Sequence, residues 1–137
     1  MASLKHQKEE ENFSYAIQLA MSNVLPQSLK LAIELGLLDI IAKAGDGAKL
    51  SASEIAAQMP TKSPEVAMML DRLLGFLATH SVVNCFDVTD DDNGQSLCLQ
   101  RVYGLSPVSK FFVTNEDDVS LVPFFLLQHD EVVYQNW

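Results

Sequence analysis

The sequence predicts a mostly α-helical fold with a winged-helix-like arrangement and one small β-hairpin. Three observations support this fold class. Apolar residues recur at helical spacing through the N-terminal half, two capped helices are separated by the four-residue turn Pro60–Ser63, and two strand-like segments follow around an acidic turn. A helix-turn-helix followed by a hairpin is the winged-helix arrangement. The length of 137 residues fits one domain.

The first predicted element is a helix from about Asn12 to Leu25. Its apolar residues follow i, i+3, i+4, i+7, i+8 and i+11 spacing, and Tyr15 and Leu19 add apolar surface outside that stripe. A helix that is apolar on more than one side needs more than one packing partner, which indicates a second chain or a second domain. We expect self-association of the chain. The residues expected in the interface between two copies are Phe13, Ile17, Ala20, Met21 and Val24. Residues 1–11 are expected to form a charged, flexible tail ahead of a single domain at 12–137.

Start and stop signals predict the next helices. Pro26 suits the first turn of one helix and Gly36 its C-terminal end. Ser51-Ala52-Ser53-Glu54 is an S-x-x-E capping box, and Ser63 followed by Pro64 opens a helix to about Thr79. The main apolar stripe predicted for that last helix is Val66, Met69, Leu70, Leu73 and Leu77. The two shorter helices between these are predicted at Leu37–Ala44 and Ala52–Met59.

The hairpin is predicted at Val82–Val88 and Leu97–Leu105, which flank the turn TDDDNGQS. A turn centred near Asp92 places Cys85 opposite Gln100–Arg101 and not opposite Cys98. A disulfide is therefore not favoured, and a reducing compartment is the simpler interpretation. Beyond the hairpin, a short helix is expected from Ser106-Pro107 to about Val113. A further apolar helix at Val119–Leu127 should bend or start late because of Pro123.

Charge and motif content exclude several functions. The net charge is −9, and the would-be recognition helix carries Met, Leu and Ala where a DNA reader carries Arg, Lys, Asn or Gln. Numbered from Asp90, an EF-hand would need Gly and Glu where Gln95 and Arg101 stand. There is no zinc spacing, P-loop or nucleophile motif, and the apolar run Leu121–Leu127 is far shorter than the about 20 residues of a membrane span. We therefore expect a cytoplasmic interaction module without catalytic residues, metal, nucleic acid or membrane partner.

Several blocks of sequence, in order, resemble the N-terminal part of plant small-molecule O-methyltransferases of the caffeic acid type. The resemblance begins in the first helix and covers nearly the whole chain after the tail. The blocks are Tyr15–Gln27 (YAIQLAMSNVLPQ), Leu37–Gly47 (LLDIIAKAGDG), Leu50–Gln58 (LSASEIAAQ), Thr61–Arg72 (TKSPEVAMMLDR), Arg101–Phe112 (RVYGLSPVSKFF) and Asn115–Ser120 (NEDDVS).

The resemblance implies a winged-helix-like dimerisation domain, followed in the family by a Rossmann-like domain that binds S-adenosylmethionine and holds a catalytic histidine. The cofactor loop and that base have no matching positions here, so the catalytic domain is absent and the chain should bind no cofactor and be inactive alone. By the same resemblance, Met21 on the exchanged N-terminal helix reaches the partner's substrate pocket. Leu127, Gln128 and Val133 lie around the phenolic ring in that pocket.

The family pattern is not matched everywhere in this pocket. Leu127-Gln128 replaces what is commonly Met-Asn, and Met21 replaces a smaller residue, so the identity of the phenol stays open. The competing interpretation of Met21 and Leu127 is that both simply fill the core.

Two functions are compatible with these observations. The first is a homodimerisation module of a phenolic O-methyltransferase, able to pair also with related methyltransferases. The second is a free-standing dimerising adaptor or truncated regulator. The two differ in whether a cofactor-binding domain is encoded after Trp137. A winged-helix DNA-binding protein is the least favoured alternative.

Overall fold

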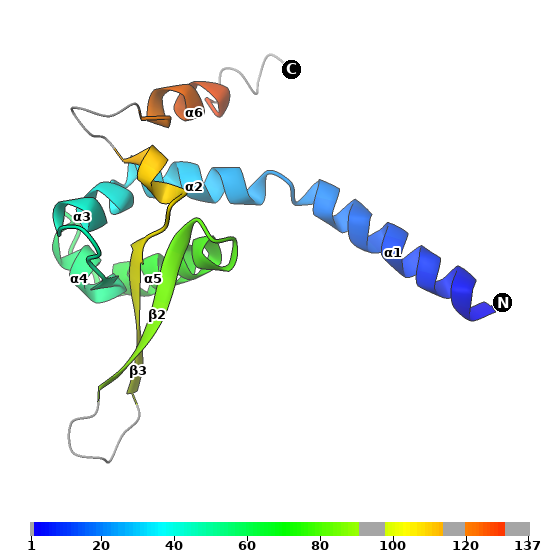
Figure 1. The fold of residues 1–137 in the computed structure, drawn as a ribbon, viewed down its shortest axis with the longest axis horizontal. Coiled ribbons are helices and arrows are strands. Elements are labelled where there is room, and N and C mark those ends of the chain that lie inside the picture. Colours follow the sequence, from blue (N-terminus) through cyan, green and yellow to red (C-terminus); the bar gives the residue numbers. More distant parts are fainter. Residues whose placement is uncertain (1, 91–97, 114–119, 131–137) are drawn as a thin grey trace.

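The structure is a computed structural model that describes residues 2–90, 98–113 and 120–130 (Figure 1). Helices predominate, and the strands form one antiparallel sheet in the order β1-β3-β2. The predicted mostly α-helical fold class is confirmed. The elements are α1 (Ala2–Ala20), α2 (Val24–Glu34), α3 (Leu37–Lys43), β1 (Leu50–Ser51), α4 (Ala52–Ala57), α5 (Pro64–Thr79), β2 (Val83–Asp90), β3 (Cys98–Leu105), the 3-10 turn η1 (Ser109–Phe112) and α6 (Val122–Gln128).

Helix α1 begins ten residues earlier than the sequence led us to expect. The expectation of a flexible tail over residues 1–11 is wrong for residues 2–11, which are helical. This segment is rich in Lys, Gln and Glu, which form helices readily. In addition, the imidazole Nε2 of His6 lies 3.1 Å from the Glu10 carboxylate one turn later. Helix propensity and this i, i+4 contact therefore favour extension of the helix into the charged segment.

The predicted single helix from Asn12 to Leu25 is interrupted at residues 21–23. Helix α1 ends at Ala20, and α2 starts at Val24. The Ser22 hydroxyl donates a hydrogen bond to the backbone carbonyl of Leu19 at 2.8 Å, a local bond of the kind that competes with regular helix. Pro26 then lies in the first turn of α2, where its missing N–H costs nothing.

The middle of the chain has the winged-helix order α3-β1-α4-α5-β2-β3. The capping box is confirmed: the Glu54 N–H donates to Ser51 Oγ at 3.1 Å, and the Ser51 N–H donates to the Glu54 carboxylate at 3.3 Å. The Ser63-Pro64 start of α5 is confirmed as well. Strand β1 was not predicted because two residues show no periodicity. It pairs with β3 through Leu50↔Tyr103.

The hairpin register differs from the predicted one. Cys85 lies opposite Tyr103, not opposite Gln100–Arg101. The ladder continues to Asp90↔Cys98, so each residue of β2 pairs with a later residue of β3 than a turn centred near Asp92 predicts. The predicted turn itself lies outside the described residues. The expectation that Cys85 and Cys98 do not oppose each other is confirmed.

The core lies between the helices and the sheet, and α5 contributes its main helical face. Leu70, Leu74 and Leu77 are buried, whereas Met69 is 66% exposed, so the predicted stripe was wrong at that position. The reason is tertiary: α5 packs simultaneously against α4, α2 and β2, and this selects the 70/74/77 face. The side chains with at most 2% exposure include Leu37, Leu38, Ile41, Ile55, Leu70, Leu74, Leu77, Val83 and Tyr103.

Candidate dimer interface

Helix α1 projects away from the rest of the molecule (Figure 1). None of its residues is buried, although it is the longest helix in the described part of the chain. Phe13 is 68% exposed, and Tyr15 and Leu19 are more than half exposed. Apolar surface of this kind is uncommon on a monomer and marks an interaction site. The sequence inference that α1 needs a partner outside its own fold agrees with this geometry.

The structure places all five predicted interface residues on the surface, in α1, in the turn after it or at the start of α2. Phe13, Ile17 and Ala20 lie on α1, at spacings that put them on one helical face. Met21 lies in the turn after α1, and Val24 begins α2; both side chains are exposed. Their contact with a second copy stays a prediction.

Helix α6 carries two of the predicted pocket residues at its C-terminal end, Leu127 and Gln128. It starts at Val122 with Pro123 in its first turn, which confirms the late start. Its inner side packs through Phe125 on Phe112, with the ring centroids 5.5 Å apart. Val133 lies outside the described residues.

The core-filling interpretation of Met21 and Leu127 is wrong for this chain. Met21 is 56% exposed and Leu127 is 62% exposed, so neither side chain fills the core between the described elements. Phe124 is exposed beside Leu127 on α6, and Leu121 at the N-cap of that helix is exposed as well; neither was among the predicted site residues. Phe124 and Leu127 are i, i+3 neighbours on the helix, and that spacing would have identified this face. The assignment of Met21, Leu127 and Gln128 to a substrate pocket stays a prediction.

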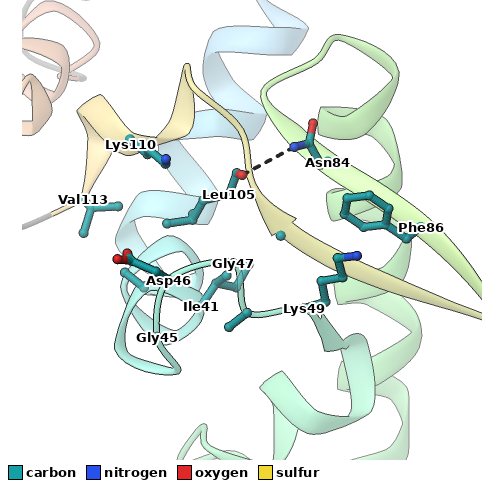
Figure 2. Close-up of a pocket in the computed structure, with 13 residues that line it drawn as sticks. Ile41, Gly45, Asp46, Gly47, Lys49, Asn84, Phe86, Leu105, Lys110 and Val113 are labelled. Carbon is teal, nitrogen blue, oxygen red and sulfur yellow. Dashed lines mark hydrogen bonds between the residues drawn. The ribbon is translucent and has the colours of Figure 1, made fainter.

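A cavity of about 490 Å³ lies elsewhere, between the α3–β1 loop, the hairpin and η1 (Figure 2). Lys49 and Lys110 line it, together with Asp46. S-adenosylmethionine carries a sulfonium and an ammonium against one carboxylate, so its net charge is positive, and in this lining the two lysines outnumber the one carboxylate. The residues of this cavity therefore do not fit that cofactor.

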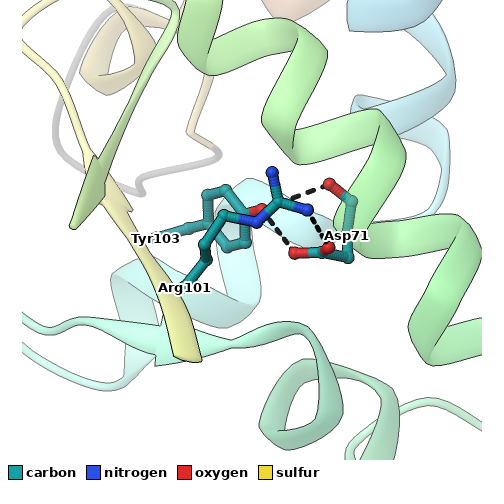
Figure 3. Close-up of polar contacts among 3 residues, drawn as sticks. All are labelled: Asp71, Arg101 and Tyr103. Carbon is teal, nitrogen blue, oxygen red and sulfur yellow. Dashed lines mark hydrogen bonds and ion pairs between the residues drawn. The ribbon is translucent and has the colours of Figure 1, made fainter. Parts of the chain in front are cut away.

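A polar cluster joins α5 to β3 on the other side of the sheet region (Figure 3). The buried Tyr103 donates a hydrogen bond from its hydroxyl to the Asp71 carboxylate at 2.5 Å, and Arg101 forms an ion pair with the same carboxylate. Burial, followed by the bond to Asp71, raises the pKa of Tyr103 above its ordinary value. The hydrogen bond to Asp71 raises the pKa of Arg101. Each polar side chain of this cluster is bonded to another member of the cluster. Its role is therefore structural, and it joins α5 to β3.

The described residues provide little support for thiol chemistry, metal binding or a membrane span. Partial burial, then the nearby Asp87 charge, raises the pKa of the Cys85 thiol, which disfavours the reactive thiolate. In the described ranges no group of three or more His, Cys, Asp or Glu side chains is placed to hold a metal ion. No helix in the same ranges has both the length and the apolar character to cross a bilayer.

The comparison with known families decides the identity of this fold. A family model described as the O-methyltransferase dimerisation domain matches residues 17–115. The chain belongs to this family. The match covers the winged-helix body together with α2 and η1, and the family's description implies that its members form dimers. Membership agrees with the exposed apolar arm formed by α1 and the turn after it.

Individual relatives support the same assignment. Caffeic acid 3-O-methyltransferase of Capsicum annuum is 50% identical over 131 residues, which cover 96% of this chain and 35% of that protein. Caffeic acid 3-O-methyltransferase 1 of Populus tremuloides is 49% identical over 129 residues, which cover 94% of this chain and 34% of that protein. The resemblance to plant caffeic acid-type enzymes is therefore confirmed. The chain spans about a third of the length of these curated relatives.

The fold has a counterpart among solved structures. Human N-acetylserotonin methyltransferase, crystallised with S-adenosylmethionine, superimposes with a TM-score of 0.65 over 89% of this chain and 31% of that one. The sequence identity is 16%, so this similarity concerns the fold alone.

Proposed function

We propose that the chain is the dimerisation part of an S-adenosylmethionine-dependent O-methyltransferase that methylates a phenolic hydroxyl, and that it is inactive alone. The observation that carries the proposal is the exposed apolar arm of a chain that belongs to the dimerisation family. The names of the relatives at 49–50% identity support the caffeic acid-type chemistry. Helix α1 of each copy would pack on the other across a two-fold axis, since an isologous interface uses the same patch twice.

In this proposal the arm also contributes to the substrate site. Met21 would enter the partner's pocket, where Leu127, Gln128 and Val133 of that partner surround the phenolic ring. The exposure of Met21 and Leu127 supports this role, because both apolar side chains are left uncovered within one chain. Gln128 is exposed as well, and its amide could hydrogen-bond a ring hydroxyl or methoxyl.

The cofactor would be held by residues outside this chain. The charges of the 490 Å³ cavity support that assignment, since an excess of lysine opposes a cofactor of positive net charge. Calorimetry of the chain with S-adenosylmethionine should show no saturable heat at micromolar concentrations. A saturable micromolar isotherm would contradict the assignment.

The proposed partners are a second copy or a related methyltransferase, with a phenolic small molecule in the complete enzyme. We expect neither nucleic acid nor membrane binding, and a cytoplasmic location. Met68 and Met69 are exposed on α5, the helix that reads bases in DNA-binding winged helices, and the adjacent β2 carries Asp87. The methionines offer no hydrogen-bond donors to base edges, and Asp87 and the net charge of −9 repel a phosphate backbone.

Sedimentation of matched truncations tests the proposed dimer. Removing residues 1–20 deletes α1 without removing a buried side chain, and this variant should sediment as a monomer. Removing residues 1–11 is the control: it deletes the charged half and keeps Phe13, Ile17 and Ala20, so the dimer should persist. An unchanged dimer after loss of residues 1–20 would refute the α1-mediated arrangement.

A further inference from the structure

In the turn η1 and in helix α6, one of two neighbouring phenylalanines lies inside and the other lies on the surface. Phe112 and Phe125 pack on each other and against the buried core. Their chain neighbours Phe111 and Phe124 are 57% and 64% exposed. The Leu121 N–H donates to the Phe111 carbonyl at 2.8 Å, which joins η1 to the start of α6. We call the exposed apolar residues here the α6 patch; they are Phe111, Leu121, Phe124 and Leu127.

Within the described part of the chain, the α6 patch is left uncovered. Helix α1 of the same chain projects away from α6, so it does not reach these side chains (Figure 1). Exposed apolar surface of this kind marks an interaction site, and phenylalanine is enriched in the buried centres of protein interfaces. The patch is therefore a candidate docking surface.

The α6 patch and helix α1 carry opposite charges and then apolar side chains in the same order. On α1, one face carries in succession Glu10, Phe13 and Ile17, and Met21 follows in the turn. At the patch, Lys110 directly precedes Phe111, which the hydrogen bond to Leu121 joins to Phe124 and Leu127.

Charge and length both suit a contact between these two surfaces. The Lys110 side chain is exposed, and no carboxylate of the described residues lies within 4.0 Å of its ammonium. At 1.5 Å per residue, Phe13 and Met21 are about 12 Å apart along the chain axis, and Leu121 and Leu127 are about 9 Å apart. The apolar stripe of α1 is thus long enough to cover the patch.

The exposed methionines of α5 do not match α1 in this way. Met68 and Met69 are flanked on the same helix by Glu65 and Arg72, which carry charges of both signs. That surface offers no net positive charge to the glutamates that precede Phe13.

We propose that the α6 patch is the docking surface for α1 of a second copy, with Glu10 of that copy beside Lys110 and the apolar stripe of α1 along α6. This inference rests on the proposed function, in which α1 mediates dimerisation, and it adds the surface on which α1 docks. The shared order makes the two helices run parallel, so Met21 of one copy lies beside Leu127 of the other. Because each copy supplies one α1 and one patch, the two contacts are equivalent and the dimer is closed.

Sedimentation equilibrium of charge-reversed variants of the 137-residue chain tests the contact between Glu10 and Lys110. Lys110→Glu should raise the dimer dissociation constant about tenfold, because two attractive pairs become repulsive. Glu10→Lys should have a similar effect, and the double variant Glu10→Lys/Lys110→Glu should return the constant to within about threefold of its original value. The control Lys62→Glu makes the same charge change at an exposed lysine outside the patch and should leave the constant unchanged.

The variant Phe124→Asp tests the apolar part of the patch. It should raise the dimer dissociation constant at least about a hundredfold, since a carboxylate in each copy would be buried without a partner. Met69→Asp on α5 adds the same charge at a similarly exposed position and should leave the dimer nearly unchanged. Both positions are exposed in the single chain, so circular dichroism should show the same helix content for the two variants.

Three results would overturn the proposed docking surface. They are an unchanged dimer in Phe124→Asp, equal weakening by Phe124→Asp and Met69→Asp, and no recovery of the dimer in the double charge-reversed variant.

The truncation that removes residues 1–20 separates this inference from the proposed function. If the truncation abolishes the dimer and Phe124→Asp does not weaken it, the α1-mediated dimer stands and the docking surface is wrong. The α6 patch would then be left for the part of a methyltransferase that lies outside this chain. If neither change weakens the dimer, both the docking surface and the α1-mediated dimer are refuted.

Discussion

Helices α1 and α3 obtain their stability in opposite ways. Helix α1 has nineteen residues and buries none, whereas α3 has seven residues and buries Leu37, Leu38 and Ile41. A seven-residue helix is far too short to persist alone in water, so α3 exists because its apolar face is covered within the chain. The longer α1 has an apolar face that this chain leaves uncovered. The contrast indicates that one part of the molecule is complete in a single copy and the other is not.

The largest expected effect is on the unfolding free energy of the part that is complete in a single copy. Leu74 is fully buried in the core face of α5, so Leu74→Ala should lower the free energy of unfolding by about 2–5 kcal/mol through lost burial and the cavity left behind. Met68→Ala on the exposed side of the same helix should change it by less than about 0.5 kcal/mol. Urea unfolding followed by circular dichroism measures both. Equal losses would mean that the buried face of α5 is misassigned.

Substitutions in α1, the part that a single copy leaves incomplete, should weaken dimerisation and leave the stability of the fold unchanged. Ile17→Asp places a carboxylate in the α1 stripe and should weaken association by about 3 kcal/mol, since the charge must be buried without a partner. Gln18→Asp, one position off the stripe, has the same charge change and should leave the dimer nearly unchanged. Sedimentation equilibrium of the two variants compares the constants directly. If they are the same, α1 presents a different face to its partner.

The sequence predicted the winged-helix body well because its helix ends depend on local chemistry. The Ser51–Glu54 capping box and the Ser63-Pro64 start are contacts within four residues, and both are present in the structure. The hairpin register was wrong, since it depends on where the chain closes between Asp90 and Cys98. Strand β1 was missed because it is defined only by its pairing with β3.

For the candidate interface, the sequence identified the apolar stripe but could not say what covers it. The same periodicity describes the buried face of α5 and the exposed face of α1, since the pattern records amphipathicity and not the partner. Met69 shows the limit within one helix: its spacing fits a core stripe, yet the elements packed around α5 leave it outside. Burial is a property of the assembled fold, and for α1 of the assembled dimer.

A smaller effect on the unfolding free energy is expected from the hydrogen bond that joins α5 to β3. Tyr103→Phe removes the hydroxyl that donates to the Asp71 carboxylate and should cost about 1.5–3 kcal/mol of unfolding free energy at neutral pH, the range for hydrogen bonds to charged groups. The pKa of Tyr103 is raised in the folded state, so its contribution is complete below the ordinary tyrosine pKa of about 10 and is lost as the pH rises above it.

The pH dependence separates this tie from simple packing. The unfolding free energy of the unsubstituted chain should fall more steeply above about pH 10 than that of Tyr103→Phe, so that the two curves converge. Urea titrations at a series of pH values measure the difference. A constant offset across that range would show that the hydroxyl acts only through its volume.

The smallest expected effect joins the two regions, because Met21 lies on the arm and Gln128 on α6. In the complete enzyme that the proposed function implies, Met21→Ala should weaken substrate binding by about 0.3–1.5 kcal/mol, the range for a methionine sulfur against an aromatic ring. The loss should appear in KM for the phenol and not in cofactor affinity, since the contact is equal in the ground and transition states.

Gln128→Ala should instead change the preference between phenols that differ in one ring hydroxyl or methoxyl. Both side chains are exposed in the single chain, so neither substitution should lower its melting temperature appreciably. Relative kcat/KM on two phenols, measured with the melting temperature for each variant, distinguishes these roles. A stability loss with unchanged substrate preference would defeat the pocket assignment, and the two side chains would then serve packing alone.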